Sequence, residues 1–153
     1  MKPSKRILLA EDDPKDVELT LTALAEYRLA DEVVVARDGV EALDYVYRRG
    51  AYATRPTGNP AVILLDLKMP RLDGLQVLRD LKADEQLCQV PIVILTSSRE
   101  DRDLAECYRL GVNAYVVKPV DFQQFAEAAR QIGVFWAAVN EPPPAGAADR
   151  EAV

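Results

Sequence analysis

Residues 62–74 read Val-Ile-Leu-Leu-Asp-Leu-Lys-Met-Pro-Arg-Leu-Asp-Gly, in which an uninterrupted apolar run ends at an aspartate. Four other short apolar runs occupy residues 7–10, 33–36, 92–95 and 114–117. Runs of this length without polar alternation, many of them rich in β-branched residues, are typical of strands buried on both faces of a sheet. The sequence therefore predicts five buried strands.

Segments with a helical spacing of apolar residues lie between these runs. The first has Asp13 as its predicted N-cap, followed by a proline; the others are predicted to span 39–49, to begin near Asp73, to span 100–110 and to begin at Asp121. Strands and helices that alternate in series predict a parallel sheet with helices on both faces. The predicted fold class is α/β, with a doubly wound, five-stranded parallel sheet of flavodoxin-like (βα)5 topology.

The predicted organisation is one folded domain, residues 5–139, and a Pro/Ala-rich tail, residues 140–153, that is expected to be disordered. The net charge of −6 argues against nucleic acid as a partner, because binding to a phosphate backbone needs a basic surface. No apolar run approaches the roughly 20 residues of a membrane span, and none has the length of a signal-peptide core. We therefore expect a cytoplasmic protein that binds neither nucleic acid nor membrane.

The sequence contains no histidine. This excludes Ser-His-Asp and Cys-His catalysis and histidine-bearing metal sites on this chain. Cys88 and Cys107 have no motif spacing and are expected to be buried or half-buried thiols. Any chemistry must therefore depend on carboxylates, hydroxyls and lysines.

Polar residues follow the predicted strands at the edge where their carboxyl ends meet. Residues 11–13, Glu-Asp-Asp, follow the first strand, Asp66 follows the third, Thr96 the fourth and Lys118 the fifth. In an open α/β sheet, ligands bind at this edge. Carboxylates so close together need a cation, and hard oxygen ligands suit Mg²⁺. A carboxylate there can attack a phosphoryl group while the metal and a lysine neutralise its charge.

Each of these residues also has a simpler structural role open to it. Asp13 is favoured as a helix cap, and for Asp12 capping and metal binding are evenly balanced. Lys118 by itself would be an ordinary solvated lysine. Asp66 is different because residues 67–70 separate it from the next helix, so it cannot cap that helix. The coincidence of such residues at successive strand ends favours a functional site.

At residues 7–13, 64–74, 91–96 and 111–119 the chain resembles response-regulator receiver domains of the CheY-like superfamily, over about residues 5–139. The resemblance implies the receiver fold and a single-domain response regulator of a two-component phosphorelay. Such a protein has no output domain, is not an enzyme, and takes its phosphoryl group from a histidine kinase.

The resemblance also implies the acceptor and its metal site. Asp66 would be the phosphoacceptor. Glu11 and Asp12 would hold Mg²⁺ together with Asp66 and the backbone carbonyl of Lys68. Glu11 stands where many members have aspartate, but the charge is kept.

Further positions take their roles from the same resemblance. Thr96 and Lys118 would contact the phosphoryl group. Thr96 and Tyr115 would be the switch residues that respond to phosphorylation. The Lys118–Pro119 peptide bond would be cis.

A finer resemblance concerns residues 11–20, the long loop at 51–60 and the pair Phe135-Trp136. These features are similar to those of response regulators paired with phytochrome-type photoreceptor kinases. The resemblance therefore implies a bacteriophytochrome as a candidate partner kinase.

The last predicted helix carries more aromatic side chains than one face can bury. Phe135 and Trp136 lie about 100° apart on an α-helix, so one of them is expected at the surface. Exposed aromatics are favoured anchors of interfaces. Together with the resemblance, this predicts a homodimer through the fourth helix, fifth strand and fifth helix, with Phe122, Phe135 and Trp136 in the interface. The alternative is that the proline-rich tail covers this surface.

Three other functions remain as alternatives. An aspartate-nucleophile phosphatase of the haloacid dehalogenase kind needs a second aspartate two residues after the nucleophile, where this chain has Lys68. A flavin-binding module needs a Ser/Thr/Gly-rich phosphate loop after the first strand, where the acidic residues 11–13 of this chain would repel a phosphate in the absence of a metal. A degenerate receiver used only for docking conflicts with the complete set of acidic, hydroxyl and lysine residues.

Overall fold

The structure, a computed structural model, describes residues 6–144. Strands and helices alternate along the chain as the sequence predicts. The elements are β1 (Ile7–Ala10), α1 (Pro14–Ala25), η1 (Ala30–Glu32), β2 (Val33–Ala36), α2 (Gly39–Tyr47), η2 (Gly50–Tyr52), β3 (Val62–Leu65), α3 (Gly74–Ala83), β4 (Ile92–Thr96), α4 (Asp101–Leu110), β5 (Ala114–Val117), α5 (Phe122–Gly133) and η3 (Val134–Val139). The elements η1 and η2 are short 3₁₀ turns, and η3 is π-helical.

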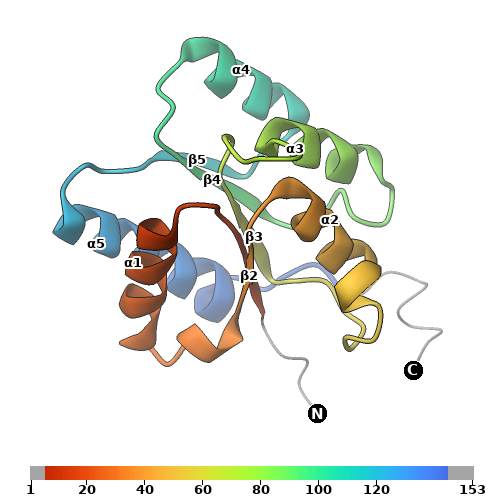
Figure 1. Cartoon of the computed structure of the whole chain (residues 1–153), viewed down its shortest axis with the longest axis horizontal. Helices are drawn as coiled ribbons and strands as arrows, with labels where there is room; N and C mark the ends of the chain where they lie inside the picture. Colours follow the sequence, from red (N-terminus) through yellow and green to blue (C-terminus); the bar gives the residue numbers. More distant parts are fainter. Residues whose placement is uncertain (1–5, 145–153) are drawn as a thin grey trace.

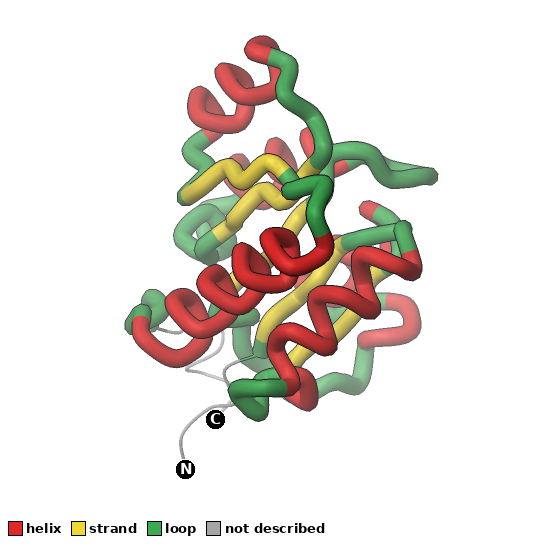
Figure 2. Tube along the Cα trace, turned by 90° about the vertical axis from the view of Figure 1, so that its left-hand side faces the viewer, coloured by secondary structure: helices red, strands yellow, loops and turns green. Residues whose placement is uncertain are grey.

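The five strands form one parallel sheet in the order β2-β1-β3-β4-β5. Figure 1 shows α1 and α5 on one face of the sheet and α2, α3 and α4 on the other. In the perpendicular view of Figure 2, the strands form a layer between the helices. The predicted doubly wound, flavodoxin-like sheet is therefore confirmed.

The strand β1 contributes to two separate cores. Ile7 and Leu9 pack with residues of α1 and α5, whereas Leu8 and Ala10 pack with residues of α2, α3 and α4. This division follows from the alternation of side chains along a strand. Burial on both faces explains why the strand sequences lack polar alternation.

Four of the five α-helices begin at an aspartate. The side chains of Asp13, Asp38, Asp73 and Asp121 each accept a hydrogen bond from a backbone N–H of the first turn. These bonds satisfy N–H groups that have no partner within the helix. The helix starts predicted at Asp13, Asp73 and Asp121 are thereby confirmed.

The end of α2 differs from the prediction. The helix stops at Tyr47, and Arg48 takes a left-handed conformation with φ of 57°. Its guanidinium donates two hydrogen bonds to the carbonyl of Arg55, at 3.2 and 3.1 Å. These contacts with the loop that follows, seven residues along the chain, offset the cost of a left-handed arginine.

The C-terminal helix also differs from the single regular helix that the sequence predicts. The α-helix ends at Gly133, where an added Cβ would lie 2.2 Å from Cδ2 of Leu24, so α5 crosses α1 at close range. The chain then widens into the π-helical η3, which buries Ala137 and packs Trp136 partly against the core. Phe135 is left 47% exposed. The expectation that one of the two aromatics reaches the surface is confirmed, although the 100° geometry behind it does not apply to a π-helix.

Gly74 sets the distance between α3 and the end of β3. A Cβ at this position would approach the carbonyl oxygen of Asp66 to 2.1 Å and the Cα of Leu67 to 2.8 Å. The N–H of Gly74 donates to the carbonyl of Leu67 at 2.9 Å. Only glycine therefore lets α3 begin this close to Asp66.

Within residues 6–144, no helix has both the length and the apolar character needed to cross a membrane. The predicted tail, residues 140–153, lies mostly outside the described residues, which end at residue 144.

Candidate functional site

A cleft of about 430 Å³ opens at the carboxyl edge of the sheet, where the sequence predicts the site. The loops after β1, β3, β4 and β5 and the first turns of α1 and α5 form its walls. It is lined by Glu11, Asp12, Asp13, Asp16, Asp66, Lys68, Ser97, Lys118, Pro119, Val120 and Phe125.

Glu11, Asp12 and Asp66 form a cluster of carboxylates in this cleft. One oxygen of each lies within 4.8 Å of the others. Glu11 is 3% exposed and Asp66 is 7% exposed, whereas Asp12 faces solvent. Two buried carboxylates and one solvated carboxylate make a hard-oxygen donor set that fits a divalent cation which keeps some of its water ligands. The sequence prediction that these residues come together is confirmed.

The ammonium group of Lys118 lies against the cluster. Its Nζ donates to Oε1 of Glu11 at 2.5 Å, to Oδ2 of Asp16 at 2.8 Å and to Oδ2 of Asp66 at 3.0 Å. Burial opposes the charge of the ammonium, but the hydrogen bonds to Asp16 and Glu11 outweigh burial and raise the pKa of Lys118. The lysine therefore supplies a permanent positive charge beside the acceptor carboxylate.

The ionisation state of Glu11 depends on pH. Burial raises its pKa to about 7, and the neighbouring Asp66 adds to this effect, while the hydrogen bond from Lys118 opposes it. Without a cation, Glu11 thus exchanges its proton near neutral pH.

Both carboxylate oxygens of Asp66 have partners. Oδ2 accepts from Lys118, and Oδ1 accepts a longer bond, at 3.4 Å, from the backbone N–H of Lys68. The backbone N–H of Asp66 donates to the carbonyl of Ala10 at 3.1 Å, which continues the pairing of β3 with β1. These bonds fix Asp66 at the carboxyl end of β3. Lys68 is a further lining residue of the cleft.

Thr96 and Tyr115 do not line the cleft and are joined through one loop residue. Oγ1 of the fully buried Thr96 accepts from the N–H of Ser98 at 3.3 Å, and the Tyr115 hydroxyl donates to the carbonyl of Ser98 at 3.1 Å. The hydroxyl of Ser98 in turn donates to Asp103 of α4 at 2.6 Å. The loop between β4 and α4 therefore connects both predicted switch residues to α4.

The three aromatics predicted for a dimer interface lie on α5 and η3. Phe122 is 70% exposed, Phe135 is 47% exposed, and Trp136 is half-buried. The rings of Phe135 and Trp136 meet edge to face, with centroids 5.0 Å apart. These positions leave two of the three aromatics free to contact another molecule.

The implied cis bond between Lys118 and Pro119 is wrong for this structure, in which the described residues contain no cis peptide bond. The preference of an X–Pro bond for trans is only about 0.5–1 kcal/mol, so the residue pair alone does not determine the isomer.

Asp16 is the site residue that the sequence analysis missed. It lies in the first turn of α1, contacts Lys118 and lines the cleft. The other polar residues of the site follow strands, whereas Asp16 reaches the site from a helix. Its position four residues after Asp12, in the first turn of a helix that starts at the sheet edge, is the signal that could have identified it.

Comparisons with known proteins agree with this geometry. Residues 7–130 match the family model described as response regulator receiver domain. The chain belongs to this family. Response regulator Rcp1 of Synechocystis sp. is 34% identical over 134 residues, which cover 88% of this chain and 90% of Rcp1.

Solved structures of phytochrome response regulators resemble this chain over most of its length. Phosphorylated RcpA, a cyanobacterial phytochrome response regulator, is 37% identical with a TM-score of 0.85, over 93% of this chain and 100% of RcpA. The bacteriophytochrome response regulator AtBRR is 58% identical with a TM-score of 0.72, over 92% of this chain and 100% of AtBRR. The Mn²⁺-bound form of Rcp1 is 32% identical with a TM-score of 0.83, over 92% of this chain and 99% of Rcp1.

The chain is thus a receiver domain of two-component signalling, related to response regulators of phytochromes. Membership of the family implies a histidine kinase partner and a divalent metal at the acidic cleft. Stand-alone receiver domains are generally not classical enzymes. The phosphatase and the docking-only alternatives are not favoured.

Proposed function

We propose that Asp66 accepts a phosphoryl group from a phosphohistidine of a sensor kinase, in a reaction that requires Mg²⁺. The observation that carries this proposal is the position of Asp66. Its carboxylate belongs to the three-carboxylate cluster and also accepts a hydrogen bond from Lys118. Among the three carboxylates of this cluster, Asp66 follows the central strand β3, whereas Glu11 and Asp12 follow β1.

The chemistry is a direct transfer. An oxygen of Asp66 attacks phosphorus, the new P–O bond forms as the P–N bond to histidine breaks, and the histidine nitrogen keeps the electron pair. Lys118 is placed to pair with a phosphoryl oxygen, because its Nζ already lies 3.0 Å from Asp66. The step consists mainly of positioning and charge neutralisation, so it needs no general base on this chain.

Glu11, Asp12, Asp66 and the backbone carbonyl of Lys68 are the proposed ligands of the metal. When bound, Mg²⁺ would neutralise the phosphoryl oxygens and the acidic ligands. The hard-oxygen cluster supports this assignment. So does the Mn²⁺-bound form of the relative Rcp1.

Thr96 and Tyr115 are proposed to transmit the change. A phosphoryl group on Asp66 places new charge beside β4 and offers a charged acceptor to the proton of the Thr96 hydroxyl, whose present backbone partner, the N–H of Ser98, is a donor. Movement of Thr96 would release its bond with Ser98, to which Tyr115 is also joined. The output would then be a rearranged surface of α4, β5 and α5.

The proposed partner kinase is of the phytochrome type, as the names of the relatives RcpA and AtBRR suggest. We also propose that the domain extends over residues 5–139, past the residues that match the family, because Trp136 and Ala137 of η3 pack on its core. The cytoplasmic location expected from the sequence stays a prediction.

A homodimer through α4, β5 and α5 is proposed as well. The exposure of Phe122 and Phe135 supports it, since large exposed aromatics anchor interfaces. Sedimentation of the chain at micromolar concentration would test it, with Phe135→Ser and Phe122→Ser as variants. A monomer in both phosphorylation states, or a dimer indifferent to both substitutions, would contradict this interface.

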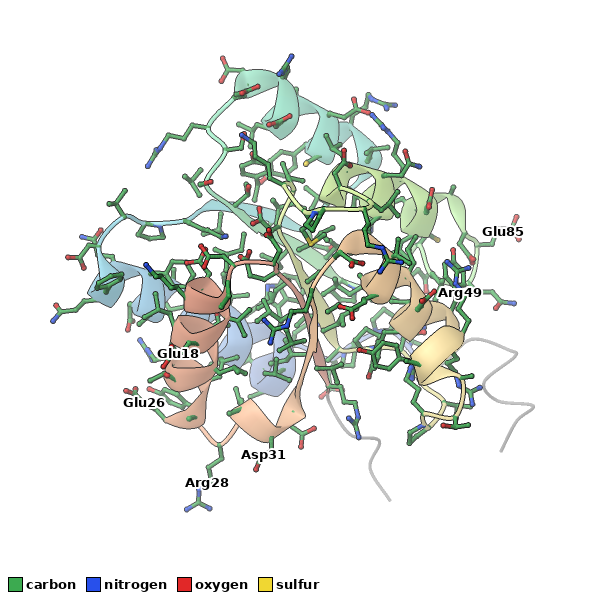
Figure 3. The ribbon with its side chains drawn as sticks, viewed as in Figure 1. Glu18, Glu26, Arg28, Asp31, Arg49 and Glu85 are labelled. Carbon is green, nitrogen blue, oxygen red and sulfur yellow. The ribbon has the colours of Figure 1, made fainter. Side chains whose placement is uncertain are left out.

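The acceptor is tested with labelled phosphoramidate, a small donor whose P–N bond resembles that of phosphohistidine. Labelling is expected with Mg²⁺ and is expected to be lost when the metal is chelated or when Asp66→Asn is introduced. Asp31→Asn is a matched control, because Asp31 precedes β2 at the opposite edge of the sheet and is exposed (Figure 3). Undiminished labelling of the Asp66→Asn variant would refute the assignment.

A further inference from the structure

The ammonium of Lys118 is shared between two kinds of carboxylate. Glu11 and Asp66 belong to the cluster that fits a divalent cation, whereas Asp16 does not. An ammonium has three N–H donors, and in this structure Lys118 directs one to each of these three residues. Two of its three hydrogen bonds therefore occupy oxygens of the proposed metal ligands.

A bound cation would compete with the hydrogen bonds that Lys118 makes to Glu11 and Asp66. A divalent ion at Glu11 and Asp66 competes with the ammonium for the same carboxylates and repels it. The side chain of Lys118 is only 9% exposed, so an ammonium that loses its partners cannot be compensated fully by water. The binding of a cation is therefore favoured if another acceptor, outside the metal ligands, remains available to the lysine.

Asp16 meets this requirement. Its carboxylate lies 2.8 Å from Nζ and its side chain is 21% exposed, so the pair is partly removed from water. Its backbone is held firmly, because Oγ1 of the buried Thr20 donates to the carbonyl of Asp16 at 2.8 Å. The first turn is further fixed by the cap at Asp13. Asp16 therefore offers an acceptor on α1 that does not need to move.

We propose that Asp16 is a positioning residue that retains the Lys118 ammonium when a divalent cation occupies Glu11, Asp12 and Asp66. By holding the lysine, Asp16 favours cation binding and keeps the ammonium beside the acceptor oxygen. The inference rests on the proposed function, because it assumes that this cluster is the metal site. Its distinctive consequence is that Asp16 acts through Lys118 and not through its charge alone.

The test is a double-mutant cycle in which Mn²⁺ binding to the purified full chain is measured by the spin resonance of the free ion, and Mg²⁺ by competition. Asp16→Asn is expected to weaken Mn²⁺ binding about tenfold, the order of one charge-assisted hydrogen bond. Lys118→Met is expected to strengthen binding, because it removes the competing cation. In the Lys118→Met background, Asp16→Asn is expected to change the affinity less than about twofold.

Glu18→Gln is the charge-matched control. Glu18 lies on the same helix, is exposed (Figure 3) and does not line the cleft. This variant is expected to leave Mn²⁺ affinity unchanged, and thermal unfolding of every variant reports whether the fold is kept. An equal effect of Asp16→Asn in both backgrounds would overturn the positioning role, because it would indicate a general effect of charge.

The failure of the inference and the failure of the proposed metal site can be distinguished with Asp12→Asn. If that variant binds Mn²⁺ as the unmodified chain does, the metal site itself is misplaced. If Asp12→Asn weakens binding and Asp16→Asn does not, the metal site stands and the role given to Asp16 is wrong.

Discussion

Lowering the pH from 8 to 6 is expected to weaken the binding of a divalent cation at the carboxylate cluster. Burial raises the pKa of Glu11 to about 7 in the metal-free protein. A metal ligand must be ionised, so a proton on Glu11 competes with the cation. The sign follows directly: binding is at full strength above the raised pKa, where Glu11 is ionised, and is lost as the pH falls through that value.

The size of the effect follows from the same pKa. With one competing proton that titrates at about 7, the apparent dissociation constant rises about tenfold between pH 8 and pH 6, or about 1.4 kcal/mol. A carboxylate that titrated at its ordinary value near 4 would change the affinity very little over this range. The dependence on pH therefore distinguishes a buried Glu11 from a solvated one.

Titration of the chain with Mn²⁺ at several pH values, with spin resonance of the free ion as readout, measures this dependence. Glu11→Gln is the control: it is expected to bind more weakly and with a much flatter pH profile, because the titrating group is gone. An affinity for Mn²⁺ that is constant from pH 8 to 6, or that declines only below pH 5, would refute the reasoning about Glu11.

Three further predictions follow from single contacts. Gly74→Ala should destabilise the chain by about 1–3 kcal/mol and slow labelling of Asp66, because its Cβ would meet the Asp66 carbonyl at 2.1 Å; thermal unfolding and labelling rates check this, and an unchanged midpoint would contradict it. Tyr115→Phe removes the hydrogen bond to Ser98 and should cost about 1 kcal/mol; denaturant unfolding measures the loss, and no loss would mean that the bond contributes nothing. Phe135→Ser should change unfolding free energy by less than about 1 kcal/mol because Phe135 is half exposed, while it lowers any dimer content in sedimentation; a large loss of monomer stability would place this ring in the core.

Much of the fold could be predicted because each strand is short, apolar and buried on both faces, and because aspartates mark helix starts. The end of α2 could not, since it depends on Arg48 reaching the carbonyl of Arg55. The π-helical turn after Gly133 could not either; it begins where α5 passes close to Leu24 of α1, an approach between two helices that the local sequence does not indicate. Both departures lie where the chain contacts residues outside the helix concerned, and such contacts can outweigh local preference.

The candidate site was predictable to the same extent as the sheet. Glu11, Asp66 and Lys118 follow strands, and parallel strands bring their carboxyl ends to one edge. The sequence does not reveal how the lysine divides its hydrogen bonds, because Asp16 enters from the side of α1. Nor could it indicate that burial would raise the pKa of Glu11.

Chemical identification of the modified residue shows whether Asp66 is the phosphoacceptor. The unmodified chain is phosphorylated with phosphoramidate and Mg²⁺, the acyl phosphate is reduced with borohydride, and the peptides are sequenced by mass spectrometry. Reduction converts a phosphorylated aspartate to homoserine and leaves free carboxylates intact. Homoserine is expected at position 66, with the carboxylates at every other acidic position of the cleft unreduced; homoserine at position 12, 13 or 16 with Asp66 intact would contradict the assignment of Asp66.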